Sequence, residues 1–126
     1  MNHTCDVLIG TCIDFRFQEY INRWISENFP PKSFDRVAIA GGVKDLEFTV
    51  SQVEIAHRLH HIKKVVFINH EDCGAYGEEN IPDKEAELLR HNEDLQTIAD
   101  RVRSDLPSLA VETYYLHLNG TFEVVK

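Results

Sequence analysis

Residues 64–74 read KVVFINHEDCG, and this stretch sets the expected fold and the expected chemistry together. The letters KVVFIN are mostly apolar and rich in β-branched side chains, which predicts a buried strand at residues 64–69. His70 and Cys73 follow this strand directly, and imidazole and thiolate groups are common metal ligands. The stretch therefore predicts a strand with a candidate metal site at its carboxyl end.

Short apolar runs on both sides of this stretch predict further strands, and apolar residues at spacings of three and four predict amphipathic helices. We expect strands at residues 6–11, 36–40, 64–69, 111–118 and 121–125, and helices at residues 17–29, 45–59 and 84–106. In the helix at 45–59, the inner face is assigned to Leu46, Phe48, Val50, Val53, Ile55 and Ala56. The pair Asn119-Gly120 is a strong hairpin signal, so the last two strands should be antiparallel.

Strands that alternate with helices indicate right-handed crossovers and a parallel sheet covered on both faces. The expected fold class is therefore α/β, with a mostly parallel central sheet, an antiparallel C-terminal edge strand and helices on both faces. A chain of 126 residues without a linker or an internal repeat is expected to form a single domain over residues 1–126.

Composition and charge narrow the function classes. Apolar residues make up 43% of the chain and charged residues 27%, as in ordinary globular proteins. The net charge of −8 repels phosphate backbones and anionic lipids, so we expect neither nucleic acid nor a membrane as partner. The start MNHTCD does not resemble a secretory signal, so we expect a cytoplasmic location. Three cysteines in such a chain favour thiol or metal chemistry over disulfides.

Three residues form a candidate zinc-binding set. Cys12 follows the first strand, His70 and Cys73 follow the third, and open α/β sheets bind ligands at the carboxyl ends of their strands. Two thiolates and one imidazole leave a fourth zinc position for water or substrate. The pair Gly41-Gly42 closes the second strand with an expected tight turn or close backbone approach, and the glycine after Cys73 is expected to give that loop its backbone freedom.

The motifs around these residues carry a family resemblance. They read Cys12-Ile13-Asp14-Phe15-Arg16, then Ala40-Gly41-Gly42, then His70-Glu71-Asp72-Cys73-Gly74. This pattern resembles the β-class carbonic anhydrases, whose ligand motifs are C-x-D-x-R and H-x-x-C-G with an A-G-G or A-G-N turn between them. The resemblance extends over residues 6–125 and includes the order of strands and helices. We expect a four-stranded central sheet of order 2-1-3-4 and an antiparallel edge strand.

The resemblance also implies a cofactor, Zn²⁺, and a role for each matching residue. Cys12, His70 and Cys73 match the family's zinc ligands, and Asp14 and Arg16 match its paired catalytic carboxylate and guanidinium. In this family zinc lowers the pKa of bound water, and the resulting hydroxide attacks carbon dioxide to give bicarbonate. The carboxylate that matches Asp14 accepts a hydrogen bond from the hydroxide and aims its lone pair at the substrate. In some members the carboxylate instead closes the site as a fourth ligand. Relatives are dimers or multiples of dimers, so we expect a homodimer or a higher homo-oligomer. The expected substrate pocket consists of Phe15, Gly41, Gly42 and Gly74.

The sequence also departs from the family pattern. Only eleven residues precede Cys12, so the family's N-terminal helical arm and its glutamine are expected to be absent. Phe15 stands where a small residue is common, and it should narrow the pocket or make it more apolar. Glu71 and Asp72 stand where neutral residues are common, and we expect their charges to raise the pKa of bound water.

Several alternatives remain open. The substrate is carbon dioxide or a linear analogue such as carbonyl sulfide or carbon disulfide, or the protein is a non-catalytic zinc-binding protein of the same fold. A redox or phosphatase-like use of Cys12 is weaker, because no C-x5-R loop follows it. The remaining candidates are assigned ordinary roles: Cys5 as a bystander, His57, His60 and His61 at a helix end, His91 and His117 as surface or core residues, and the acidic residues at 78–87 as a solvated face and helix start.

Overall fold

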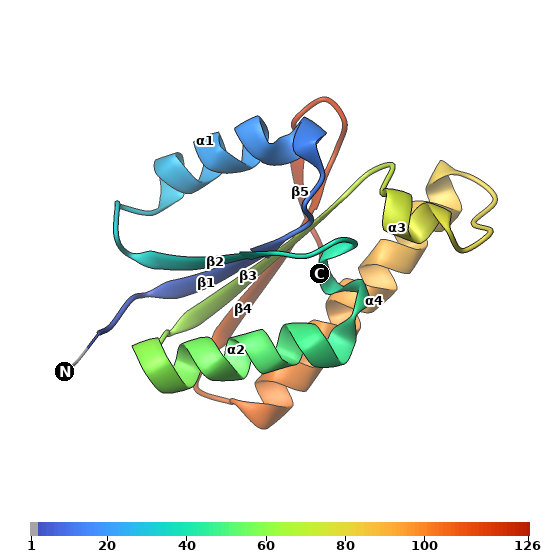
Figure 1. Ribbon diagram of the computed structural model, residues 1–126. Coiled ribbons are helices and arrows are strands. Elements are labelled where there is room, and N and C mark those ends of the chain that lie inside the picture. The colour runs from blue at the N-terminus through green and yellow to red at the C-terminus, as the bar shows by residue number, and fades with distance from the viewer. Residues whose placement is uncertain (1–2) are drawn as a thin grey trace.

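Strand β3 (Lys64–His70) lies at the centre of a five-stranded sheet in the computed structural model, which describes residues 3–126. The strand order is β2-β1-β3-β4-β5, with all neighbouring pairs parallel except the antiparallel β4 and β5 (Figure 1). The other strands are β1 (Val7–Thr11), β2 (Phe34–Ala38), β4 (Ala110–Leu116) and β5 (Phe122–Val124). The expected order 2-1-3-4 with an antiparallel edge strand is confirmed.

Helices cover both faces of this sheet, as expected (Figure 1). They are α1 (Gln18–Asn28), α2 (Leu46–His60), α3 (Gly74–Gly77) and α4 (Lys84–Asp105), with 3₁₀ turns η1 (Phe15–Phe17) and η2 (Gly42–Lys44). Helix α1 packs on one face, and α2 and α4 pack on the other. Within residues 3–126, no helix is both long and apolar enough to cross a membrane.

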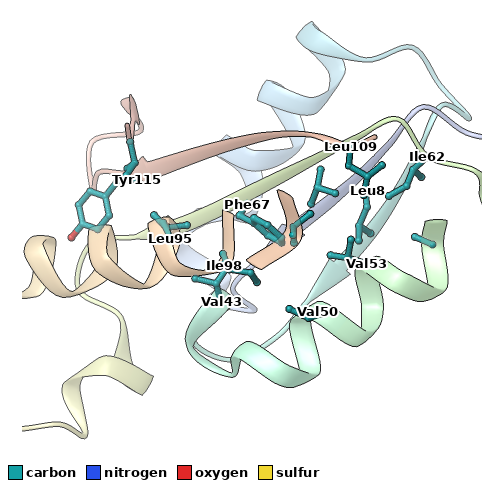
Figure 2. Packing of buried hydrophobic residues seen from close by; sticks show 14 residues of the cluster. Leu8, Val43, Val50, Val53, Ile62, Phe67, Leu95, Ile98, Leu109 and Tyr115 are labelled. Carbon is teal, nitrogen blue, oxygen red and sulfur yellow. The ribbon is translucent and has the colours of Figure 1, made fainter. Parts of the chain in front are cut away.

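The two faces of the sheet form separate cores, because successive side chains of a strand point to opposite sides. Val7 and Ile9 of β1 pack against α1, whereas Leu8 between them packs with α2 and α4. Figure 2 shows the second core, in which Leu8 and Phe67 from the sheet lie with Leu95 from α4. Full burial of a large apolar side chain contributes about 1.5–3 kcal/mol. These contacts hold the carboxyl ends of β1 and β3 in place.

The observed element boundaries follow caps and strand pairing. Asp45 and Asp83 accept hydrogen bonds from the first turns of α2 and α4, so each stands just outside its helix as the N-cap. Strand β2 begins two residues earlier than the expected 36–40, because its register is set by pairing with β1, in which Val7 faces Phe34 and Thr11 faces Ala38. Helix α3 lies in a region that we expected to be a loop.

The inner face expected for α2 is partly wrong. Phe48 and Ile55 are 46% and 38% exposed, whereas Val50 and Val53 are buried as expected. At 100° per residue, positions 48 and 55 lie on nearly the opposite side of the helix from Val53, so they cannot reach the sheet. We assigned Phe48 and Ile55 to the core because they are apolar, although the helical period places them on the side of α2 that faces away from the sheet.

Candidate metal centre

The three candidate zinc ligands meet where β1 and β3 end. Cys12 directly follows β1, His70 is the last residue of β3, and Cys73 stands just before α3. One donor atom from each lies within 4.8 Å of the other two, and all three residues are buried. The parallel register places Thr11 beside Ile68, so the ends of these two neighbouring strands come together as the sequence predicts.

The imidazole of His70 is oriented as in a metal-binding histidine. Its Nδ1 lies 2.8 Å from the carbonyl oxygen of Glu71, and its ring packs on Phe17 with the centroids 4.2 Å apart. Nδ1–H donating to a carbonyl leaves a lone pair on Nε2. Among the residues that the structure describes, this buried Nε2 has no hydrogen-bond partner. A buried nitrogen without a partner is costly, and a cation at this position would satisfy it.

The two thiols support the same interpretation. A hydrogen bond from the Cys73 thiol, together with one from the backbone N–H of Gly41, lowers the pKa of Cys12 to about 3. The bond to Cys12, together with burial, raises the pKa of Cys73. Burial lowers the pKa of His70, but hydrogen bonds to Cys12 and to the carbonyl group of Glu71 raise it by more, so the pKa lies above its usual value. Without a metal, the cluster therefore holds protons where a divalent cation would bind instead.

Asp14 and Arg16 form the pair that the first motif predicts. The guanidinium of Arg16 donates to both carboxylate oxygens of Asp14, with Nη2 lying 2.7 Å from Oδ2, and the backbone N–H of Arg16 donates to Oδ1 at 2.8 Å. Hydrogen bonds from Arg16 hold the pKa of Asp14 below its usual value. Oδ2 of Asp14 is 3.9 Å from Nε2 of His70, so the carboxylate faces the same space as the three candidate ligands. Arg16 also donates to the carboxylate and the carbonyl of Asp72, which joins the two motifs.

The glycine pair between the motifs makes the close backbone approach that we expected. Gly41 has φ of 85°, which favours glycine, and its N–H donates to Sγ of Cys12 at 3.4 Å. Gly42 has φ of 60°, and a Cβ there would overlap Oδ1 of Asn69. That oxygen instead accepts a hydrogen bond from the backbone N–H of Val43. Gly42 therefore packs behind the site against β3.

A buried hydrogen-bond network behind the site was not identified from the sequence. Asn69 uses Oδ1 for Val43, so its Nδ2 donates to Nδ1 of His91 at 2.9 Å, and Nε2–H of His91 is left to donate to Glu87 at 3.3 Å. Burial lowers the pKa of His91 to about 4, so this imidazole is neutral. The hydroxyl of Tyr76 adds a contact to Nδ2 of Asn69. The network connects β3, α3 and α4 beneath the candidate ligands.

Glu87 is the member of this network that touches the metal-site loop. Its two carboxylate oxygens accept the backbone N–H groups of Asp72 and Cys73, both at 2.9 Å. The expectation of a solvated acidic face is therefore wrong for Glu87, and also for Glu79, which pairs with Lys44 and Arg90. Asp83 does begin a helix, as expected. No local pattern distinguishes Glu87 from the exposed glutamates around it.

The geometry of the second motif bears on two expectations. Glu71 does not face the candidate ligands, because its carboxylate accepts the N–H of Leu118 at 2.9 Å and pairs with Lys84. The charge of Asp72 is paired with Arg16, so neither residue adds an unpaired charge at the site. The loop was expected to need the backbone freedom of Gly74, but the residue with left-handed backbone is Asp72, whose φ is 58°. A side chain at Gly74 would meet open space, so this glycine is not needed for the turn.

The candidate ligands open into a shallow pocket of about 330 Å³ with a largely apolar lining. Phe15 lies at this pocket and is 84% exposed, and Ile13 beside it is also exposed. Of the expected pocket residues, Phe15, Gly41 and Gly74 line it. Gly42 does not belong to its lining, because it lies against Asn69.

Comparisons with known proteins identify a family and two similar proteins. Residues 1–126 match the model of a family described as "Putative carbonic anhydrase". An uncharacterized protein of Rickettsia conorii is 30% identical over 99% of this chain and 74% of its own length. A second uncharacterized protein, from Rickettsia bellii, is 29% identical over 99% of this chain and 84% of its own length.

Solved structures of carbonic anhydrases share this fold. The enzyme of Streptococcus mutans superposes with a TM-score of 0.72 at 15% identity, over 99% of this chain and 84% of that one. The carbonic anhydrase of Glaciozyma antarctica gives 0.70 at 14% identity, over 100% and 85%. A tetrameric β-carbonic anhydrase of Sordaria macrospora gives 0.64 at 16% identity, over 98% and 82%. With its motifs, its sheet order and the family match over its whole length, this chain belongs to the β-class carbonic anhydrase family.

Proposed function

We propose that this protein catalyses the zinc-dependent reversible hydration of carbon dioxide to bicarbonate. The observation that carries the proposal is the juxtaposition of three buried metal donors with a carboxylate held by an arginine. The donor atoms of Cys12, His70 and Cys73 lie within 4.8 Å of one another. The carboxylate of Asp14 faces them and is hydrogen-bonded to Arg16. A carbonic anhydrase requires these two parts, a metal-binding set and a hydrogen-bond acceptor beside it.

Each residue has a defined task in this proposal. Cys12, His70 and Cys73 would hold Zn²⁺, which supplies a Lewis acid that activates water near neutral pH. The three N–H donors of Arg16 leave Asp14 about one lone pair, with which it would accept a hydrogen bond from the reacting water and thereby orient it. Arg16 keeps Asp14 ionised and holds its carboxylate beside the metal donors. The backbone N–H of Gly41 stabilises the thiolate of Cys12.

The pocket suits a small, linear, uncharged substrate. Its lining includes Ile13, Phe15, Ala40 and Ala75, so most of the surface around the candidate ligands is apolar. Carbon dioxide fits this description, and carbonyl sulfide and carbon disulfide fit it as well. The apolar ring of Phe15 favours testing these sulfur analogues in the same assays.

Stopped-flow hydration of carbon dioxide on the zinc-loaded protein tests the proposal. We expect activity that rises with pH, and we expect Asp14→Asn to lower the rate by about 10²-fold or more while zinc stays bound, because the acceptor is lost and no ligand is touched. Glu19→Gln, an exposed change on α1, is the matched control and should leave the rate unchanged. Cys73→Ser should remove one equivalent of zinc, since a hydroxyl replaces a thiolate poorly.

Two outcomes count against the proposal. A zinc-loaded protein without activity at any pH, on carbon dioxide or its sulfur analogues, would favour a non-catalytic zinc-binding protein of the same fold. A Cys73→Ser variant that keeps its full zinc content would show that Cys73 is not a zinc ligand.

We further propose that the chain acts as a homodimer or a larger homo-oligomer in the cytoplasm. Helix α1 offers little apolar surface for association, because it buries its apolar side within its own chain. The better argument is the unpaired edge of β2 together with the exposed Phe15. Light scattering tests the association, and a stable monomer at micromolar concentration contradicts it. The three free cysteines suit a reducing compartment such as the cytoplasm.

A further inference from the structure

A second group of metal-binding side chains lies at the opposite end of the sheet. Cys5, Asp35 and His60 each offer a donor atom, and these three atoms lie within 4.8 Å of one another. Nδ1 of His60 is 2.6 Å from Oδ2 of Asp35. Cys5 and Cys12 are seven residues apart along an extended strand, so roughly 20 Å separates this group from the candidate zinc site.

The backbone around this group is held by regular structure. Asp35 belongs to β2 and is paired in register with Leu8 of β1. His60 is the last residue of α2, and its carbonyl oxygen accepts the N–H of Cys5 at 3.0 Å. In Figure 1 the segment that leads into β1, the start of β2 and the end of α2 lie at the left, away from α3. Three separate segments thus present their donors to one point on a fixed scaffold.

We propose that Cys5, Asp35 and His60 form a second zinc site, which fastens the N-terminal segment to β2 and α2. A thiolate, a carboxylate and a neutral imidazole balance the charge of Zn²⁺, and all three are common zinc ligands. Coordination replaces the thiol proton of Cys5, which passes to solvent. Asp35 and His60 are each about one-third exposed, so water completes the tetrahedron.

The present spacing needs only a small adjustment to accept the ion. Donor atoms about 2.0–2.1 Å from a tetrahedral zinc lie roughly 3.3 Å apart. The pair of His60 and Asp35, now 2.6 Å apart, would open by less than an ångström, which side-chain rotation supplies. Apart from this group, the thiol of Cys5 packs against the core that contains Leu8 and makes a long 3.8 Å contact to the carbonyl oxygen of Val7, so its sulfur keeps a lone pair within reach of both Asp35 and His60.

Zinc titration of untagged, metal-free protein against a chromophoric chelator tests the proposal. The wild type should bind two equivalents, and Cys73→Ser should lose only the site at the ends of β1 and β3. Cys5→Ser and His60→Ala should each lower the zinc affinity of the site formed by Cys5, Asp35 and His60 by at least about tenfold. Loss of a hydrogen-bond partner of a ligand already costs about 10–100-fold in metal affinity, and loss of the ligand itself costs no less. His57→Ala, one turn earlier on α2, is the matched control and should keep both sites.

Cobalt provides an independent readout. Co²⁺ added to Cys73→Ser should give a thiolate charge-transfer band that disappears in the Cys5→Ser/Cys73→Ser double variant. A wild type with a single site that Cys73→Ser abolishes overturns the proposal, and so does a second site that survives both Cys5→Ser and His60→Ala. These measurements need no carbon dioxide activity, so the two proposals succeed or fail separately.

Discussion

Replacement of Glu87 by glutamine tests how the metal-site loop is held. The carboxylate accepts the backbone N–H groups of Asp72 and Cys73, one on each oxygen, and the Nε2–H of His91. Glutamine has one oxygen and one NH₂ group, so one backbone N–H would face another donor. Asp72 also has the left-handed φ of 58°, which is unfavourable for a residue with a side chain and depends on such support.

The size of the effect follows from these contacts. A hydrogen bond to a charged group contributes about 1.5–3 kcal/mol, and Glu87→Gln loses at least one of them. We expect a loss of about 2 kcal/mol, divided between folding and metal binding. If all of it appeared in binding, zinc affinity at the site that contains Cys73 would fall about 30-fold. This lies within the 10–100-fold range for residues that orient metal ligands.

The assay is zinc competition on the variant, combined with urea unfolding of the metal-free form. Glu85→Gln is the matched control, because Glu85 is exposed in the same first turn of α4 and should leave both measurements unchanged. An affinity within twofold of the wild type, together with unchanged unfolding, would show that Glu87 does not hold the loop and would refute this account.

Three further predictions follow from the site. His91 has a folded pKa of about 4, lowered by burial, against about 6.5 in the unfolded chain. The unfolded state therefore binds more protons between these values, so stability should fall by about 2 kcal/mol from pH 7 to pH 5, and urea unfolding of His91→Gln should lack this component. Gly42→Ala should destabilise the protein by about 2 kcal/mol or more in thermal unfolding, because it adds a left-handed alanine and displaces Asn69. A smaller loss there would mean that the loop can move away from β3. Glu71→Gln should leave the pH profile of carbon dioxide hydration unchanged, since Glu71 faces Leu118, and a shift to lower pH would restore the role expected from the sequence.

Much of this architecture is determined by local sequence. The β-branched run at residues 64–69 and the helical spacing of α1 and α4 depend on neighbours within a few positions, so periodicity is enough to predict them. The candidate ligands were also predictable, because the carboxyl ends of parallel strands meet at one edge and place Cys12 beside His70. The position of β2 was less certain, since its register depends on pairing with β1.

Only the tertiary structure decided which polar residues serve the site. Glu87 looks like any glutamate at a helix start, and it reaches the backbone of Cys73 only because α4 packs beside the end of β3. Glu71 immediately follows a candidate ligand, yet its side chain turns toward the β4–β5 hairpin. The convergence of Cys5 with His60 likewise depends on segments 55 residues apart. Sequence periodicity records which face of an element is apolar, whereas the partner of a single polar group is set by long-range packing, which no local pattern encodes.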